Sequence, residues 1–270
     1  MSPADLLAAL GHAAPDFFII GVQKGGTTSL YNYLARHPAV LPASEKEIHY
    51  FTDHFRRGDA WYRARFPTRY RKWRRMLGLR ARILTGEATP YYIFHPHAAR
   101  RIEARYPDAR IILMLRNPVD RAYSHYRYHV KLGVETLSFE QAIAAEPQRL
   151  AGELERMMAD ESYCSESYKL FSYLRRGVYI EQVRRWREYF PREQMLILRS
   201  EDFFADPARC FLEVTQFLGL PHHELPSYDT FNAGAEAALP AGMRQQLSEY
   251  FRPYNAQLRD YLGIDFGWDR

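Results

Sequence analysis

The 270-residue chain has only two cysteines and no long apolar run. The first shortage argues against a disulfide-rich protein, and the second argues against a transmembrane protein. Two cysteines, Cys164 and Cys210, cannot build a disulfide framework, so we expect free thiols in a reducing cytosol, with one disulfide left open. The N-terminal apolar stretch, residues 6–15, is too short to cross a bilayer, and no basic segment precedes it as in a signal peptide. The sequence therefore predicts a cytoplasmic protein without an integral membrane segment.

The excess of one charge sign is also small. The net charge of +5 favours anionic ligands, but it does not by itself indicate nucleic acid, and we expect no nucleic-acid partner. Basic residues are densest in RYRKWRRMLGLRAR, residues 69–82. Such a run is typical of a solvated helix face, and the alternative is a rim that guides an anionic acceptor such as an acidic glycan.

Short apolar runs alternate with helical patterns along the chain. Near-continuous apolar segments, as in strands buried on both faces of a parallel sheet, occur at 16–22, 110–116 and 194–200, and more weakly at 81–87. Amphipathic patterns predict helices at 27–37, 118–132, 138–146, 179–190, 206–220 and 240–263, with a break at Pro253 left open. We expect one α/β domain over residues 1–270, with a mainly parallel central sheet flanked by helices and an insertion or flap at 147–172.

The stretch GVQKGGTTS, residues 21–29, combines the features of an anion-binding loop. Gly25 and Gly26 allow the backbone N–H groups to approach an anion, and the following helix presents its positive end. Lys24 adds a mobile cation, and hydroxyl donors come from Thr27, Thr28 and Ser29. A plain strand-to-helix turn is the alternative, but so many glycine and polar residues beside a lysine favour a ligand.

Two features of ATP- and GTP-binding loops are missing. Gly21 and Gly26 keep their spacing, but Thr27 stands where the lysine of those loops should be. The apolar segment at 110–116 ends in Arg116, whereas those proteins carry a metal-holding aspartate at the end of such a strand. These differences predict a ligand with two anionic groups and no magnesium, which describes 3′-phosphoadenosine 5′-phosphosulfate (PAPS).

With these motifs the chain resembles the PAPS-dependent sulfotransferases, most closely their heparan-sulfate-type and bacterial carbohydrate-type branch. Residues 19–38 resemble the family's 5′-phosphosulfate loop, and LRNPVDRAYSHYRYH, residues 115–129, resembles its 3′-phosphate motif. EKEIHYF, residues 45–51, resembles the segment with the catalytic glutamate. The resemblance covers nearly the whole chain and implies a P-loop-like three-layer fold, PAPS as donor, adenosine 3′,5′-bisphosphate (PAP) as product, and no metal.

The resemblance also implies roles for single residues. Lys24 would lie beside the bridging oxygen between phosphate and sulfate, where negative charge grows during transfer. Arg116 and Ser124 would hold the 3′-phosphate. The 5′-phosphate would be held by Gly25, Gly26, Thr27, Thr28 and Ser29.

Glu47 is the predicted general base for the acceptor's proton, and we expect partial burial to raise its pKa. Glu45 fits the family motif less well. His49 would assist or orient the base, and the alternative for it is a purely structural histidine.

The chain departs from the heparan-sulfate enzymes at two positions. Thr52 stands where they have aspartate, although Asp53 is adjacent, and Ala88 replaces a lysine, for which Glu87 is a candidate compensation. The resemblance implies a small-molecule or glycan acceptor, preferably a carbohydrate or glycolipid. A phenol, a steroid, a peptide tyrosine and a natural-product alcohol stay open as acceptors, and so does the oligomeric state. The alternatives are a metal-dependent P-loop kinase of a small molecule and a non-catalytic basic module that binds polyanions.

Overall fold

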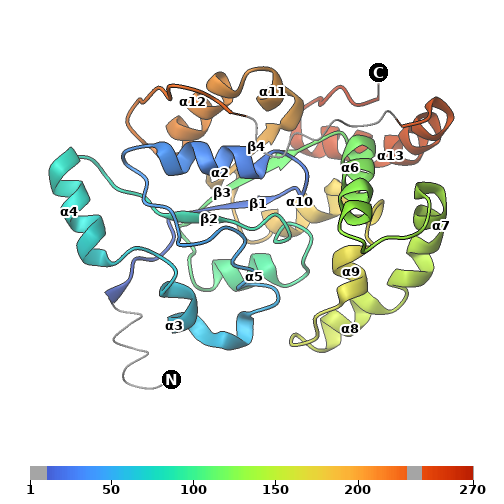
Figure 1. Ribbon diagram of the computed structural model, residues 1–270, viewed down its shortest axis with the longest axis horizontal. Helices are drawn as coiled ribbons and strands as arrows, with labels where there is room; N and C mark the ends of the chain where they lie inside the picture. Colours follow the sequence, from blue (N-terminus) through green and yellow to red (C-terminus); the bar gives the residue numbers. More distant parts are fainter. Residues whose placement is uncertain (1–10, 230–238, 270) are drawn as a thin grey trace.

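The computed structural model describes residues 11–229 and 239–269 (Figure 1). At its centre lies a parallel sheet with strand order β2-β1-β3-β4. The strands are β1 (Phe17–Gly21), β2 (Gly86–Ala88), β3 (Arg110–Leu115) and β4 (Met195–Arg199). Every residue of β1 is buried, as predicted for a strand covered on both faces. The predicted α/β class with a parallel sheet is confirmed.

The weak strand prediction at 81–87 is wrong in its position, because β2 begins only at Gly86. The backbone N–H of Leu84 donates to the carbonyl oxygen of Ala39 at 2.9 Å. The backbone N–H of Thr85 donates to the carboxylate of Asp16 at 2.8 Å. Residues before Gly86 therefore pair outside the β1 ladder, which begins at Phe17.

The predicted helices form with nearly the predicted bounds. They are α2 (Thr27–Arg36), α6 (Pro118–Lys131), α7 (Phe139–Leu150), α10 (Tyr179–Arg187), α12 (Pro207–Leu218) and α13 (Ala241–Leu262). Helix α13 runs through Pro253 without a break, so this proline interrupts the hydrogen bonding without ending the helix. Helix α7 begins with a capping box in which Ser138 and Gln141 bond reciprocally.

Shorter elements fill the connections. They are α3 (Gly58–Arg63), α4 (Arg69–Leu79), α5 (Ala98–Glu103), α8 (Glu153–Ala159), α9 (Glu166–Leu170) and α11 (Ser200–Ala205), with 3₁₀ turns η1 (Phe55–Arg57), η2 (Arg175–Gly177) and η3 (Arg192–Gln194). The region 147–172 thus holds the end of α7 and the helices α8 and α9.

The N-terminal apolar stretch, residues 6–15, lies partly outside the described residues. No helix in the described part of the chain is long and apolar enough to cross a membrane.

The sheet separates two hydrophobic cores, which makes three layers (Figure 1). Phe17 and Ile19 of β1 pack with residues of α2, α11 and α12 on one face. Phe18 and Ile20 pack with residues of α5, α6, α10 and α13 on the other. Both cysteines are free thiols, as predicted; Cys164 is exposed and Cys210 is buried.

Candidate active site

The glycine loop lies at the carboxyl end of β1 and is held from three directions. The backbone N–H of Val22 donates to the carbonyl oxygen of Met114 in β3 at 2.8 Å, and that of Gly25 donates to the carbonyl oxygen of Val22 at 2.9 Å. The hydroxyl of Ser200, which follows β4, donates to the carbonyl oxygen of Gly25 at 2.8 Å. Gly26, the N-cap of α2, has a φ of 93°, a conformation that glycine adopts without strain. The predicted strand–loop–helix unit is therefore formed, and hydrogen bonds to Met114, Val22 and Ser200 hold its loop.

The structure brings the two predicted cationic residues together. The guanidinium Nη1 of Arg116 donates to the backbone carbonyl oxygen of Lys24 at 3.0 Å. The hydroxyl of Tyr179 donates to the carbonyl oxygen of Arg116 at 2.8 Å, which fixes the chain where β3 ends. Ser124 is buried on α6, which begins two residues after Arg116. Lys24 and Arg116 are therefore close enough to contact one ligand.

Tyr128 was missed by the sequence interpretation and lies next to Lys24. The ammonium of Lys24 lies over the ring of Tyr128, 4.8 Å from its centre. Tyr128 follows Ser124 by one turn of α6, and it is 41% exposed. The i, i+4 spacing from Ser124 was the available signal. An exposed ring beside the predicted transfer lysine is suited to contact an acceptor.

The segment with the predicted base docks onto β2. The backbone N–H of Glu47 donates to the carbonyl oxygen of Ala88 at 3.0 Å, so this loop lies beside the strand that neighbours β1. Glu47 and His49 have φ values of 60° and 54°, and Lys24 has 71°. Left-handed backbone at non-glycine residues costs about 1–3 kcal/mol each and clusters at functional sites. Three of the predicted site residues share this feature.

The predicted direction of the Glu47 pKa is wrong. The Glu47 side chain is 44% exposed. Desolvation still raises its pKa, but a hydrogen bond with His49 and the positive charge of Lys46 outweigh this effect and lower the pKa to about 2. Lys46 contacts the Glu47 carboxylate directly, and His49 Nε2 lies 3.7 Å from its Oε2. Glu47 is therefore fully ionised at neutral pH, and with this pKa it is a weak base.

Thr52 and Asp53 both lie near Nδ1 of His49, the ring nitrogen that does not face Glu47. Thr52 Oγ1 lies 3.3 Å and Asp53 Oδ2 lies 3.9 Å from His49 Nδ1. Asp53 also pairs with Lys169 of α9. A chain of contacts thus runs from Glu47 through His49 and Asp53 to the 147–172 region, which sequence reasoning did not connect to the base.

Glu87 does not reach this chain of contacts directly. Its carboxylate is fully buried and accepts hydrogen bonds from Tyr62 at 2.6 Å, Thr89 at 2.7 Å and Tyr92 at 3.0 Å. Burial raises its pKa although these hydroxyls oppose that shift. Both oxygens of the Glu87 carboxylate are thus bonded to hydroxyl groups of the protein, and its role as a replacement for the lysine absent at Ala88 stays a prediction.

Arg176 of η2 contacts the glycine loop through Gln23. Its Nη1 donates to the side-chain oxygen of Gln23, next to Lys24, at 2.6 Å. Its guanidinium lies over the rings of Tyr91 and Phe94, 4.8 and 5.0 Å from their centres. Burial lowers its pKa to about 10, so it stays charged at neutral pH. This buried cation holds the residue that precedes Lys24.

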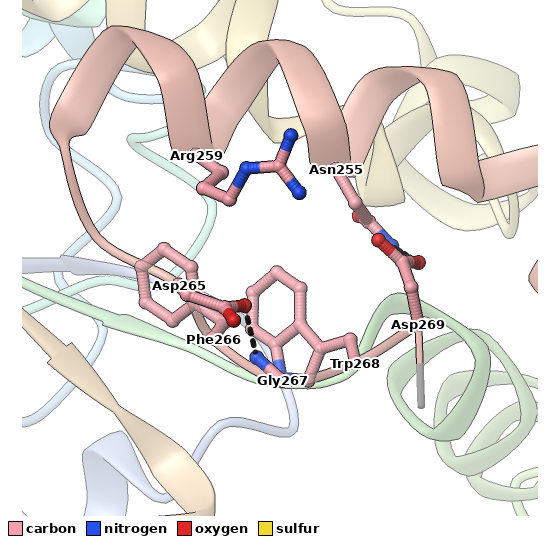
Figure 2. A pocket seen from close by; sticks show the side chains of 7 residues that line it. All are labelled: Asn255, Arg259, Asp265, Phe266, Gly267, Trp268 and Asp269. Carbon is pink, nitrogen blue, oxygen red and sulfur yellow. Dashed lines mark hydrogen bonds between the residues drawn. The ribbon is translucent and has the colours of Figure 1, made fainter.

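The C-terminal segment supports the Arg116 end of the site. Glu201 accepts the backbone N–H of Asn117 at 2.7 Å, and Trp268 Nε1 donates to the same carboxylate at 3.3 Å. Figure 2 shows Trp268 in a small pocket between the C-terminal segment and α13, which presents Asn255 and Arg259. No predicted site residue lines that pocket.

A metal-binding cluster is not found among residues 11–229 and 239–269, where no group of three or more His, Cys, Asp or Glu residues could hold an ion.

Comparison with known proteins decides the family. Residues 14–232 match the family described as Sulfotransferase domain. The chain belongs to this sulfotransferase family. The predicted enzyme class and family are thereby confirmed, and members of this family take their sulfuryl group from PAPS.

Several relatives of this sulfotransferase resemble it along most of its length. Human heparan sulfate glucosamine 3-O-sulfotransferase 6 is 30% identical over 94% of the chain, which spans 73% of that protein. Membrane-associated sulfotransferase kil1 of Dictyostelium discoideum is 27% identical over 94% of the chain, which spans 66% of that protein. The crystal structure of a sulfotransferase from Alicyclobacillus acidocaldarius superposes with a TM-score of 0.72 at 33% identity, covering 96% of this chain and all of that one. The predicted P-loop-like fold is confirmed.

Replacing Lys46 by alanine is expected to raise the Glu47 pKa, because Lys46 supplies part of the charge that lowers it. A carboxylate with a lowered pKa keeps its ionised form until the pH falls through that value. In Lys46→Ala the acid limb of kcat/KM should therefore move to higher pH. The exposed Lys131 gives the control, because Lys131→Ala should leave the limb in place. An unmoved acid limb in Lys46→Ala would show that Glu47 ionisation does not limit the reaction.

Proposed function

We propose that the protein transfers a sulfuryl group from PAPS to a hydroxyl or amine of a carbohydrate or glycolipid and releases PAP, without a metal. The observation that carries this proposal is the hydrogen bond from Arg116 to the Lys24 carbonyl, which joins two cationic sites at neighbouring strand ends. Two such sites suit a donor with anionic groups at both ends.

The residues present fit the donor by their chemistry. The predicted contacts offer backbone N–H groups at the N-terminus of α2, hydroxyls, an ammonium and a guanidinium, all of which favour phosphate oxygens. The first turn of α2 has no acidic residue that would repel an anion. When bound, PAPS supplies a sulfuryl group attached to a phosphate leaving group.

In this proposal different side chains act on the leaving group and on the acceptor. Lys24 stabilises the negative charge that grows on the departing phosphate oxygen. Glu47 accepts the proton that the acceptor loses as its oxygen or nitrogen bonds to sulfur. His49 holds the Glu47 carboxylate from one side, and Thr52 and Asp53 set the orientation of the His49 ring.

Tyr128 and the names of the relatives support a carbohydrate acceptor. An exposed aromatic ring at the predicted transfer lysine offers an apolar surface for a sugar ring. We further propose a single catalytic domain in which the 147–172 region closes over the acceptor, supported by the contact of Lys169 with Asp53. A cytoplasmic location is part of the proposal.

The test is a calorimetric titration of the protein with PAP in the presence of EDTA. The wild-type protein should bind, and Arg116→Ala should bind about 10- to 100-fold more weakly, because it loses hydrogen bonds to a charged group. Arg209→Ala removes an exposed arginine of α12 and serves as the control. Absence of PAP binding with EDTA, or equal affinities of both variants, would contradict the donor site. A labelled-PAPS assay against glycan, glycolipid and phenol acceptors then identifies the acceptor class.

A further inference from the structure

Helix α4 lies at the left edge of the molecule in Figure 1. It differs from an ordinary surface helix in having no buried residue. It begins after Thr68, whose side chain accepts the backbone N–H of Arg71 at 3.2 Å. Eleven residues form it, a length at which an isolated helix is marginal in water. The segment therefore gains little from the protein core and presents nearly all its side chains outward.

The apolar side of α4 faces away from the protein. Lys72 pairs with Asp16 at 2.6 Å, and Arg75 Nε donates to the carbonyl oxygen of Pro38 at 3.0 Å, so these two mark the side toward the body. The opposite side, by helical spacing, carries apolar residues. They are Tyr70, Trp73 and Leu77, which are 64%, 51% and 55% exposed.

Positive charge surrounds this outward apolar side. Residues 69–82 contain seven Lys or Arg residues and no Asp or Glu. By helical spacing Arg69 and Arg74 flank the apolar side on its two edges. A helix that presents aromatic and aliphatic side chains between arginines matches an anionic bilayer interface, where rings lie at the headgroup level and arginines contact lipid phosphates.

The position of α4 argues against a function as a rim of the donor site. Asp16 precedes β1, and Pro38 follows the C-terminus of α2, so both anchors lie at the amino ends of the strands. The glycine loop and Arg116 follow the carboxyl ends of β1 and β3. A partner on α4 would thus leave the donor loop uncovered.

We propose that α4 docks the protein on the surface of a membrane rich in anionic phospholipid. Tyr70, Trp73 and Leu77 insert among the headgroups, and Arg69 and Arg74 contact their phosphates. The proposal concerns a surface and stands independently of the catalytic residues.

The experiment is co-sedimentation of the full-length protein with vesicles of phosphatidylglycerol and phosphatidylcholine, and with vesicles of phosphatidylcholine alone. Wild-type protein should bind the anionic vesicles, less strongly as salt rises, with a blue shift of tryptophan fluorescence. The double variant Trp73→Ser, Leu77→Ser should partition more than about tenfold more weakly. Arg69→Glu and Arg74→Glu should each reduce partition about fivefold or more.

Control variants distinguish insertion of α4 from nonspecific adsorption of the protein to vesicles. The double variant Met158→Ser, Tyr261→Ser removes two exposed apolar side chains elsewhere and should bind vesicles as wild type does. PAP titration of each variant checks that the fold is intact. The proposal is overturned if wild type does not bind anionic vesicles at low salt, or if Trp73→Ser, Leu77→Ser binds them normally. It is also overturned if light scattering shows a dimer that these two substitutions dissociate in the absence of lipid.

Discussion

Glu47→Gln is expected to lower sulfuryl transfer by about 100- to 10,000-fold while PAP binding stays near the wild-type value. The amide has the same shape as the carboxylate but cannot take the acceptor's proton. The loop should keep its position, because Glu47 is held through its backbone N–H on the Ala88 carbonyl oxygen at 3.0 Å. The loss should therefore appear in turnover and not in donor affinity.

The lowered pKa of Glu47, about 2, does not conflict with this function. As the acceptor oxygen bonds to sulfur it becomes positively charged and strongly acidic, so a weak base can take its proton late in the step. The charges of Lys46 and His49 keep the carboxylate ionised and oriented until then. Removing the carboxylate should therefore have a large effect on the rate, and tuning its pKa only a modest one.

Glu45 provides the matched control for the base. It lies two residues earlier in the same loop, and its carboxylate pairs with Arg65 Nε at 2.8 Å. Steady-state rates with labelled PAPS and calorimetry with PAP should be measured for Glu45→Gln and Glu47→Gln together. Near-normal transfer by Glu47→Gln, or an equal loss in Glu45→Gln, would remove Glu47 from the mechanism.

Much of the fold was predictable, because it depends on local patterns. The apolar runs that became β1, β3 and β4 are long enough to identify strands, and Pro118 and Ser138 stand where their helices begin. The short edge strand β2 was misplaced, because its three residues pair with Phe17, Phe18 and Ile19, which lie far away in sequence. The residues before it, Leu84 and Thr85, bond instead to Ala39 and Asp16. Pairing of this kind leaves no periodic signal.

Some features of the candidate site could likewise be predicted from the sequence, and others could not. Lys24 and Arg116 each follow a predicted strand, and neighbouring parallel strands place their carboxyl ends together, so their meeting could be anticipated. The pKa of Glu47 could not be anticipated from the sequence, because it is set by two neighbouring side chains whose directions depend on a left-handed backbone. The pairing of Lys169 with Asp53 joins residues 116 positions apart and requires the folded structure.

Lys24→Met is expected to lower kcat by about 100- to 1000-fold, the usual cost of removing one donor from a developing negative charge. The backbone of the loop should persist, because Arg116 contacts the carbonyl oxygen of Lys24 and not its side chain. Methionine can follow the same path over Tyr128 without the charge. The substitution therefore isolates the ammonium.

The comparison of kcat with PAPS affinity, measured without acceptor, tests where the lysine acts. If its ammonium stabilises charge that appears only during transfer, PAPS affinity should fall by less than about tenfold while kcat falls much further. Lys131→Met, on an exposed lysine of the same α6 helix as Tyr128, should change neither quantity. Equal losses in PAPS affinity and in kcat/KM with kcat unchanged would make Lys24 a binding residue only, and the charge on the departing phosphate would need another partner. Arg116 is then the nearest alternative, since its guanidinium already lies against the Lys24 backbone.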